Sequence, residues 1–481
     1  MGPTEAPHRF EEASEGPGAR LLKSVVAREA TVGVIGLGYV GLPLAVAAAR
    51  QGYPTIGFDI DATKVEALSE GRSYIDSVDD AALRAVASTM SFTADFAQLS
   101  ACEVIVICVP TPLSQYREPD LSFIETTAET IAAHMSPDTL VILESTTYPG
   151  TTREVLLPIL QGGGLVPDGD FFVAFSPERE DPGNASFRTA NIPKIVGADS
   201  APARELVHAF YGNVVERVVP VSSSATAEAV KITENIFRAV NIALVNELKV
   251  IYQAMGIDVW EVIDGAATKP FGFMPFYPGP GLGGHCIPID PFYLTWKARE
   301  YGLTTRFIEL AGEINVNMPG YVVGRLREAL DRTAGLALSR SRVLVVGISY
   351  KKNVPDMRES PSVRLIDLLD ESGAEVSYLD PLVPEIPPMR EYPHLVGRRT
   401  VTADDIVPGR FDAILIATDH DCIDYAALAG LGAVVVDTRN ALARNGRLRD
   451  RYVARPAVAG ERQVRAGILV AGEAAGGLGP R

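Results

Sequence analysis

Short apolar stretches recur through the first part of the chain, and each one ends in a polar or glycine-rich segment. Such stretches are typical of buried strands in a parallel sheet. The stretches expected to form strands are Thr31–Ile35, Pro54–Phe58, Val104–Val109, Leu140–Leu143 and Phe171–Phe175. An Ala-rich helical stretch, Leu42–Arg50, separates the first two. This alternation predicts an α/β domain with a parallel, doubly wound sheet.

The pattern changes near Ser222. From Ala225 to about Met255, apolar residues recur at helical spacing while Glu, Lys and Asn occupy the other faces. A Gly/Pro-rich segment over residues 278–291 follows, and a further helical pattern runs from Phe307 to Leu330. We therefore expect one long helix within a central helical region.

A second sheet-forming region follows, and it lacks a complete G-x-G-x-x-G motif. Its expected strands are Val343–Gly347, Glu375–Leu379, Ala413–Ala417 and Ala433–Asp437. The fold class expected is α/β, with two Rossmann-like doubly wound domains joined by the long central helix. The expected divisions are a flexible tail (1–28), a first α/β domain (29–222), a central helical domain (223–335), a second α/β domain (336–458) and a flexible tail (459–481).

Composition and charge narrow the function classes. A chain of 481 residues is too long for one hydrophobic core, and a net charge of -16 disfavours non-specific nucleic-acid binding. The cysteines are scattered without metal-type spacing, so we expect no metal site and a reducing compartment. The first residues contain no apolar signal segment, and no apolar run approaches the ~18 residues of a membrane span. A soluble, cytoplasmic protein is expected.

The sequence Gly36-Leu37-Gly38-Tyr39-Val40-Gly41 lies between the first predicted strand and the following helix. In the dinucleotide-binding motif, the first glycine permits a tight turn, the second lets the backbone approach the pyrophosphate, and the third lets helix and strand pack closely. Asp59 ends the next strand, where a carboxylate binds both ribose hydroxyls and repels a 2′-phosphate. The motif therefore predicts an NAD site; a glycine turn in another kind of α/β protein is the alternative.

Cys286 lies in a loop rich in glycine and proline, Pro278–Asp290. Glycines beside a thiol let a ligand approach closely, so the loop is a plausible platform for a nucleophile. Spacing alone supports a catalytic and a structural cysteine equally. We interpret the adjacent His285 as structural.

Four further residues are candidates for catalysis. Lys231 and Asn235 are four residues apart on one helix face and could stabilise an oxyanion, although a solvated face explains the spacing better. Glu178 and Thr146 follow predicted strands, where they could steer a water or accept a proton.

Several segments together resemble the UDP-glucose/GDP-mannose dehydrogenase family, in order, from about residue 30 to 455. They are Gly36–Gly41, Val109–Pro112, Glu144–Thr147, Ser176–Glu178, Lys231 with Asn235, Gly279–Asp290, and Gly347–Ser360. The resemblance implies an NAD-binding Rossmann domain, a central region that forms a homodimer or higher homo-oligomer, and a C-terminal domain that binds the nucleotide sugar.

The resemblance also implies the chemistry. Two NAD molecules would take four electrons from C6 of the sugar, through a thiohemiacetal and a thioester on Cys286. The residues implied in catalysis are Cys286, Lys231, Asn235, Asp290, Glu178 and Thr146. Lys231 and Asn235 would stabilise oxyanions, Asp290 would position water, and Glu178 with Thr146 would serve hydrolysis.

Binding residues follow from the same resemblance. Those implied for the cofactor are Gly36, Gly38, Tyr39, Val40, Gly41, Asp59, Lys64, Pro110, Thr111 and Arg358. Those implied for the sugar nucleotide are Arg179, Glu180, Gly283, Tyr350, Lys351 and Arg439. Tyr350–Asn353 resembles a basic turn that contacts the nucleotide sugar across a subunit interface.

Two segments depart from the UDP-glucose and GDP-mannose members. The segment Ser176–Asn184 replaces an Asn-Pro-Glu-Phe-Leu type, and His285–Asp290 replaces a Ser-Cys-Phe-Pro-Lys-Asp type. Both resemble the bacterial branch that acts on 2-acetamido sugars, so the substrate expected is UDP-N-acetylglucosamine, for surface polysaccharide. The alternatives are UDP-N-acetylmannosamine or UDP-glucose as substrate, a nucleotide-sugar epimerase, and an inactive NAD-binding scaffold.

Overall fold

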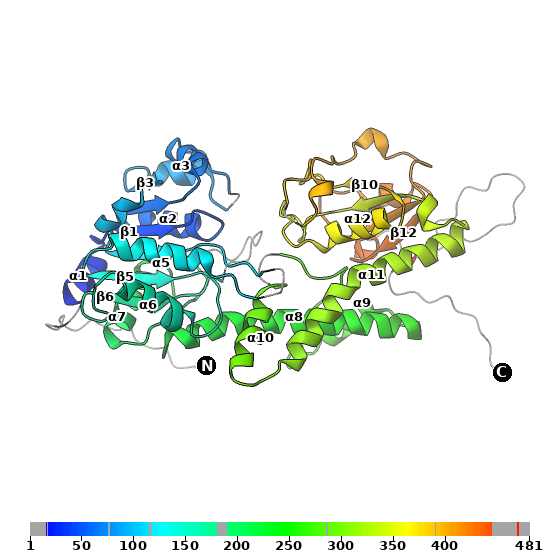
Figure 1. Ribbon diagram of the computed structural model, residues 1–481. Coiled ribbons are helices and arrows are strands. Elements are labelled where there is room, and N and C mark those ends of the chain that lie inside the picture. Colours follow the sequence, from blue (N-terminus) through cyan, green and yellow to red (C-terminus); the bar gives the residue numbers. More distant parts are fainter. Residues whose placement is uncertain are drawn as a thin grey trace, which may run out of the picture. The chain divides into compact units, whose positions relative to one another are not determined.

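The computed structural model describes residues 16, 18–75, 77–114, 118–179, 190–284, 287–389 and 391–444, together with the backbone of 469–470. The chain divides into two compact units, coloured along the sequence in Figure 1. The first comprises Met1–Glu234 with Phe292–Leu303, and the second comprises Asn235–Pro291 with Thr304–Arg481.

The first unit contains a sheet in the order β3-β2-β1-β4-β5-β6-β7-β8. The strands are β1 (Val32–Ile35), β2 (Thr55–Phe58), β3 (Met90–Thr93), β4 (Val104–Ile107), β5 (Thr139–Leu143), β6 (Phe171–Phe175), β7 (Lys194–Gly197) and β8 (Val218–Val221). All pairs are parallel except β6 with β7, which meet antiparallel at Phe175 and Gly197. The parallel sheet confirms the predicted fold class, with five strands where the apolar stretches predict them.

Helices cover both faces of this sheet, because alternate strand residues point to opposite sides. Val34 and Val106 share one core with α1 (Ala19–Ala27), α2 (Gly41–Arg50), α4 (Asp80–Val86) and α7 (Ala201–Val214). Ile105 and Ile107 share the other with α5 (Ser122–His134), α6 (Leu157–Gln161), the π-helical turn η2 (Thr152–Leu156) and the 3-10 helix η1 (Phe96–Ala101). Helix α3 (Ala62–Ser69) follows β2.

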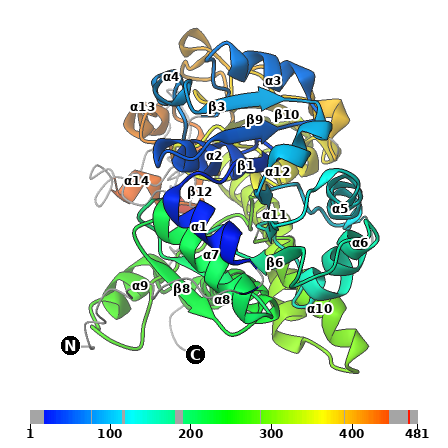
Figure 2. The ribbon, with the colours of Figure 1, turned by 90° about the vertical axis from the view of Figure 1, so that its left-hand side faces the viewer.

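Helix α1 corrects one prediction. The sequence predicts a flexible tail over residues 1–28, of which 1–15 and 17 lie outside the described residues, but Ala19–Ala27 is helical. Leu21 and Val25 are four residues apart on one face and fully buried, and α1 lies against α7 (Figure 2). This apolar pair makes the segment part of the first core.

The second unit has a parallel sheet in the order β10-β9-β11-β12-β13. Its strands are β9 (Arg342–Val346), β10 (Glu375–Leu379), β11 (Ala413–Ile416), β12 (Val434–Asp437) and β13 (Leu469–Val470). One face packs on α11 (Arg306–Ala334) and α12 (Pro361–Glu371), and the other on α13 (Tyr425–Ala429) and α14 (Ala441–Arg444). Three 3-10 helices are η3 (Leu338–Arg340), η4 (Pro393–Leu395) and η5 (Ala403–Asp405). Apart from β13, the predicted tail 459–481 lies outside the described residues.

The remaining helices are α8 (Ser224–Met255), α9 (Val259–Ala267) and α10 (Asp290–Glu300). Helix α8 matches the long helix predicted from Ala225 to Met255. Across the described ranges, no helix is both long and apolar enough to cross a membrane.

Candidate functional site

In the glycine-rich turn after β1, two of the glycines have no room for a side chain, and a third faces open space. Gly36 has a φ of 90°, and a Cβ there would lie 2.6 Å from the carbonyl oxygen of Cys108. A Cβ on Gly41 would lie 1.9 Å from the carbonyl oxygen of Gly36. A Cβ on Gly38 would meet nothing within 4 Å. Gly36 and Gly41 therefore shape the turn, while the space over Gly38 allows a ligand to approach the backbone.

Helix α2 begins directly after this turn. Its N-cap, Val40, makes no side-chain capping hydrogen bond, and the first turn of the helix contains no acidic residue. In the first turn the Leu42 amide donates to the Gly38 carbonyl at 3.1 Å and Pro43 has no N–H, so the start of α2 offers chiefly the positive end of the helix dipole, without a competing carboxylate. These features fit the diphosphate of a dinucleotide.

Asp59, directly after β2, fixes the glycine-rich turn. One carboxylate oxygen accepts a hydrogen bond from the Leu37 amide at 3.0 Å, and the other accepts one from the Asp61 amide at 3.0 Å. The Nζ of Lys64, which is partly exposed, lies 3.7 Å from Asp59 Oδ2. Tyr74, which the sequence does not single out, donates a hydrogen bond to the Leu37 carbonyl at 2.7 Å. Burial raises the pKa of Tyr74, so it remains a donor.

The loop after β4 contains the predicted cofactor residues Pro110 and Thr111. The buried hydroxyl of Tyr293, on α10, donates to the carbonyl oxygens of Thr111 at 2.6 Å and of Pro112 at 3.2 Å. No local pattern predicts this contact, because Tyr293 is remote in the sequence from the loop that it holds.

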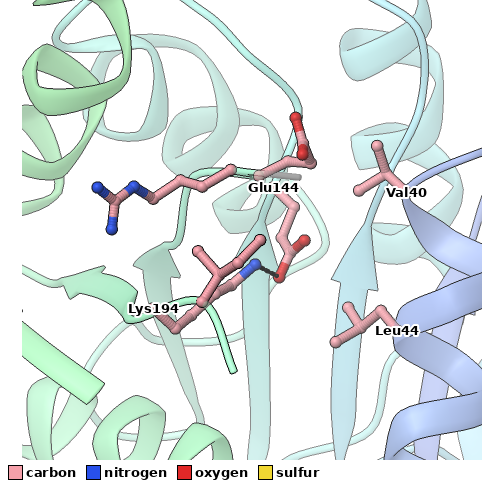
Figure 3. A pocket seen from close by; sticks show the side chains of 7 residues that line it. Val40, Leu44, Glu144 and Lys194 are labelled. Atoms are coloured by element: carbon pink, nitrogen blue, oxygen red, sulfur yellow. Dashed lines mark ion pairs between the residues drawn. The ribbon is translucent and has the colours of Figure 1, made fainter. Parts of the chain in front are cut away.

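A buried polar network lies at the end of β5 (Figure 3). Lys194 Nζ is 2.8 Å from Glu144 Oε1, and the Tyr211 hydroxyl donates to the same oxygen. Burial and the negative charge of Glu144 raise the pKa of Tyr211 well above its ordinary value, so Tyr211 stays protonated. A pocket of about 20 Å³, room for about one water, opens beside the ion pair. It is lined by Val40, Leu44, Glu144, Glu178, Arg179, Ile192 and Lys194.

Two predicted catalytic residues meet beside α8. Lys231 is almost fully buried, donates to the Glu178 carbonyl and lies 3.1 Å from Glu178 Oε2. Next to it, Arg179 Nη2 binds Glu234 Oε1 at 2.6 Å, and Arg179 Nη1 donates to the Pro193 carbonyl at 2.6 Å. The loop after β6 is thereby tied to α8. Glu180 lies outside the described residues.

The loop that contains the half-buried Thr146 is held by Glu228 of α8, which the sequence analysis does not identify. Glu228 accepts from the Gly150 amide, from the Thr152 amide at 2.8 Å and from the Thr152 hydroxyl at 2.6 Å. Burial raises the pKa of Glu228, despite these hydrogen bonds. Because Glu228 precedes Lys231 by one helical turn, both parts of the first-unit site depend on the same segment of α8.

In the second unit, Asn235 and Asp290 form a buried pair. The Asn235 amide donates to Asp290 Oδ2, and Arg238 donates to Asn235 Oδ1. Two predicted catalytic residues are therefore in contact here as well. Cys286 and His285 lie outside the described residues.

The described part of the glycine loop packs against predicted substrate residues. The Gly279 amide donates to Asn246 Oδ1 at 3.0 Å, and a Cβ on Gly279 would lie 2.6 Å from Arg439 Nη1. Arg439 Nε donates to the Ala417 carbonyl at 2.8 Å. Asn246 also donates to Asn315 of α11 at 3.0 Å. Arg439 is thus held between this loop and β11.

The turn after β9 contacts the other end of the same loop. A Cβ on Gly283 would lie 2.6 Å from Tyr350 Cβ, and the Gly284 amide donates to the Arg358 carbonyl at 3.0 Å. Lys351, next to Tyr350, is half-buried. The Arg358 side chain pairs with Asp356 at 2.6 Å. The structure thus brings together Gly283, Tyr350 and Arg358.

The chain matches three models of one family. They describe the NAD binding, central and UDP binding domains of the UDP-glucose/GDP-mannose dehydrogenase family, and they match residues 30–215, 225–317 and 344–444. A UDP-N-acetyl-D-glucosamine 6-dehydrogenase of Pseudomonas aeruginosa is 38% identical over 395 residues, which is 82% of this chain and 91% of the relative. A UDP-N-acetyl-D-mannosamine dehydrogenase of Pyrococcus horikoshii is 35% identical over 418 residues, 85% of this chain and 95% of the relative. A solved structure described as the UDP-D-ManNAc dehydrogenase from Pyrococcus horikoshii is 34% identical, with a TM-score of 0.77 over 85% of this chain and 96% of that one.

Proposed function

Because the chain belongs to the UDP-glucose/GDP-mannose dehydrogenase family of NAD-dependent enzymes, we propose that it oxidises C6 of a UDP-N-acetylhexosamine to the carboxylate. UDP-N-acetylglucosamine is the proposed substrate, and surface polysaccharide is the proposed use of the product. The pairing of Lys231 with Glu178 carries the proposal, because it places a buried cation and a carboxylate at one point of the NAD-binding unit. The names of the two relatives support the 2-acetamido class of sugar.

We propose that the glycine-rich turn and the start of α2 hold the NAD diphosphate and that Asp59 holds a ribose. When bound, NAD accepts the hydride that leaves C6. The assignment of Asp59 predicts a preference for NAD over NADP, because a carboxylate repels a 2′-phosphate.

Lys231 and Asn235 stabilise the negative charge that develops on the substrate oxygen as its proton leaves. Lys231 is suited to this role because it is buried, where an ammonium interacts strongly with a developing oxyanion. Glu178 orients Lys231 and, with Thr146, orders the water used later. Asp290, held by the Asn235 amide, positions that water and accepts its proton.

The covalent steps use Cys286. Its thiolate adds to the C6 aldehyde, and the resulting oxyanion takes up a proton to give a thiohemiacetal. Hydride transfer from C6 to a second NAD, while the hydroxyl proton leaves, then gives a thioester. Water then attacks the thioester, releasing the sugar carboxylate and the thiol. Cys286→Ser is expected to stop after the first oxidation or during thioester turnover, seen as a loss of steady-state NADH formation. Sustained two-step oxidation by this variant would overturn the covalent scheme.

For the nucleotide sugar, we propose that Tyr350, Lys351 and Arg439 bind the UDP group. Arg179, Glu180 and Gly283 contact the sugar nucleotide near C6, and Arg358 contacts the cofactor. The contacts of Gly283 with Tyr350 and of Gly279 with Arg439 support this assignment. They bring the glycine-rich loop next to the basic turn and next to the arginine that are proposed to bind UDP.

We also propose a homodimer. Large apolar side chains of α8 and α11 in the second unit are exposed, among them Phe237, Leu244, Ile251, Phe307 and Leu310. The first three recur every seven residues along one stripe of α8, which is the spacing of a helix–helix seam. Leu244→Glu is expected to shift the mass measured by light scattering from dimer to monomer.

The deciding experiment measures NADH formed per molecule of UDP-GlcNAc, UDP-ManNAc, UDP-glucose and GDP-mannose in parallel. Two NADH per UDP-GlcNAc are expected, with slower or no turnover of the others. Two NADH from UDP-ManNAc alone would reassign the substrate, and one NADH would contradict the thioester route. An absence of NADH with all four would favour an epimerase or an inactive scaffold.

A further inference from the structure

Three buried polar side chains meet at the carboxyl edge of the second sheet. Ser349 follows β9, Asp380 follows β10 and His420 follows β11, and all three are fully buried. The Nε2 of His420 lies 2.9 Å from Ser349 Oγ and 3.2 Å from Asp380 Oδ2. None of the proposed catalytic steps uses these residues.

The arrangement differs from that of a hydrolytic triad. In a triad, the Ser and the Asp occupy opposite nitrogens of the imidazole. Here both face Nε2, and Nδ1 accepts a hydrogen bond from the Asn353 amide at 2.9 Å. This contact requires a lone pair on Nδ1 and therefore a proton on Nε2. The two ring nitrogens of His420 thus bind different segments of the chain, which the side chain connects.

Asp380 binds the Nε2 side of the His420 ring. Burial raises the pKa of Asp380, but hydrogen bonds from His420 and from the Ile348 and Leu382 amides outweigh burial, so the pKa lies below its ordinary value. The Ile348 amide donates at 2.7 Å and the Leu382 amide at 2.9 Å. The carboxylate therefore remains charged and keeps its hydrogen bonds.

Asn353 holds the Nδ1 side and ends the basic turn that begins at Tyr350. Its φ of 60° is unusual for a non-glycine residue. Its side chain donates to Asp421 Oδ2 at 2.6 Å, while the Asp421 amide donates back at 2.9 Å. Lys352 Nζ lies 2.6 Å from Asp421 Oδ1, at the exposed side of the turn. His420 thus provides a buried contact between this turn and the sheet.

We infer that His420 is a positioning residue for nucleotide binding, whose Nδ1 anchors the Asn353 amide and so presents Tyr350 and Lys351 to the UDP group. The inference rests on the proposed function, which assigns this turn to UDP. Because His420 is fully buried and acts through the turn, its loss is expected to change the affinity for UDP and the KM for the sugar nucleotide, while kcat stays nearly unchanged.

Two conservative variants separate the two sides of the ring. The carbonyl of His420→Asn can take the place of Nδ1, whereas the amide of His420→Gln reaches the place of Nε2. We expect UDP affinity by calorimetry to stay within about twofold in His420→Asn and to fall about tenfold in His420→Gln, the effect of one lost buried hydrogen bond. NAD affinity is expected to be unchanged in both, and His394→Gln, at an exposed histidine of the same unit, is the matched control.

The outcomes distinguish the inference from the function beneath it. If wild-type protein binds no UDP, the assignment of the turn to UDP fails. If wild-type protein binds UDP but His420→Gln binds it equally well, or if both variants lose UDP and NAD affinity together, His420 does not position the turn. Rescue by Asn together with a KM effect at constant kcat supports the inference.

Discussion

After the first strand of each sheet, the backbone forms the same glycine turn, held by a carboxylate that follows the second strand. The two sheets differ in the residues that surround this carboxylate. The Gly36 amide donates to the Phe58 carbonyl and the Gly347 amide to the Leu379 carbonyl, each at 2.8 Å. Leu37 donates to Asp59 at 3.0 Å, and Ile348 donates to Asp380 at 2.7 Å. Both glycines have positive φ, 90° and 76°.

The carboxylates nevertheless meet different surroundings. Asp59 is 7% exposed beside the partly exposed Lys64, whereas Asp380 is fully buried beside His420. The first turn continues into a helix, and the second continues into the basic turn Tyr350–Asn353. A carboxylate at this position can therefore bind a ribose only where no side chain covers it. Where a side chain does cover it, as at Asp380, the carboxylate holds the neighbouring loops in place.

The largest expected effect comes from filling the glycines. A Cβ on Gly41 would lie 1.9 Å from the Gly36 carbonyl oxygen, and one on Gly347 would lie 2.1 Å from the Thr418 carbonyl oxygen. Backbone must move in each case, at a cost of about 3 kcal/mol, or roughly 100-fold in affinity. Gly41→Ala is expected to weaken NAD binding by about this factor and to spare UDP binding, and Gly347→Ala is expected to do the reverse. Calorimetry with each ligand tests this, and joint loss in either variant would contradict the independence of the two turns.

The buried lysines of the two units also differ in their partners. Lys194 and Lys231 of the first unit are paired with carboxylates, whereas Lys249 Nζ has no hydrogen-bond partner among the described residues of the second. Burial lowers the pKa of Lys249 to about 8, opposed by Asp437 and Asp258 and reinforced by Arg439 and Arg325.

The unfolded chain therefore binds more protons than the folded chain between pH 8 and 10.5, and stability rises with pH across that window. Lys249→Met removes the penalty, so the variant is expected to be more stable than wild type at pH 7 by about 3 kcal/mol, with the difference shrinking by pH 10. Urea unfolding at both pH values measures this. Equal stabilisation at both would exclude titration of Lys249 as the cause.

Neutralising each carboxylate is expected to have a smaller and unequal effect. Asp59→Asn keeps an acceptor for Leu37 but loses charge-assisted bonds to a ribose, so NAD affinity is expected to fall about tenfold while NADP is tolerated better. Asp380→Asn is expected to leave the NAD/NADP ratio unchanged. Kinetics with both cofactors provide the test, and an altered ratio in Asp380→Asn would break the comparison.

The smallest effect is expected at Lys64. Its ammonium lies 3.7 Å from Asp59 and is solvated, so the pair contributes less than about 1 kcal/mol. Lys64→Ala is expected to weaken NAD binding by about threefold at low salt and less at high salt. A loss as large as that of Asp59→Asn would instead indicate the direct contact with the cofactor that the family resemblance implies for Lys64.

Short-range sequence patterns predict the elements that depend on neighbouring residues alone. The buried strands, the long helix α8 and the turn at Gly36–Gly41 follow from short-range periodicity and glycine placement, and the structure has them where they were expected. Strands β3, β7 and β8 were not predicted: β3 contains Ser91 and Thr93, β7 begins with Lys194, and β8 contains Pro220, which is unusual within a strand.

The supporting residues of the site could not be predicted in the same way. Tyr293 meets Thr111 across 182 positions, Glu228 meets Thr152 across 76, and His420 meets Asn353 across 67. Each is an ordinary residue in its own sequence context, because its role depends on a partner that only the tertiary fold supplies. Residues that lie in recognisable motifs can therefore be predicted from the sequence more readily than the residues that hold those motifs in place.

The reversal between β6 and β7 has a consequence for how such a sheet can evolve. In an all-parallel sheet, side chains reach the ligand edge only from the loops that follow strands. Since β7 runs the other way, its first residue, Lys194, reaches the edge where β5 ends at Glu144. The inversion of β7, which β8 shares because it pairs parallel with β7, thus gives selection a second source of functional groups, the beginnings of strands, without lengthening any loop.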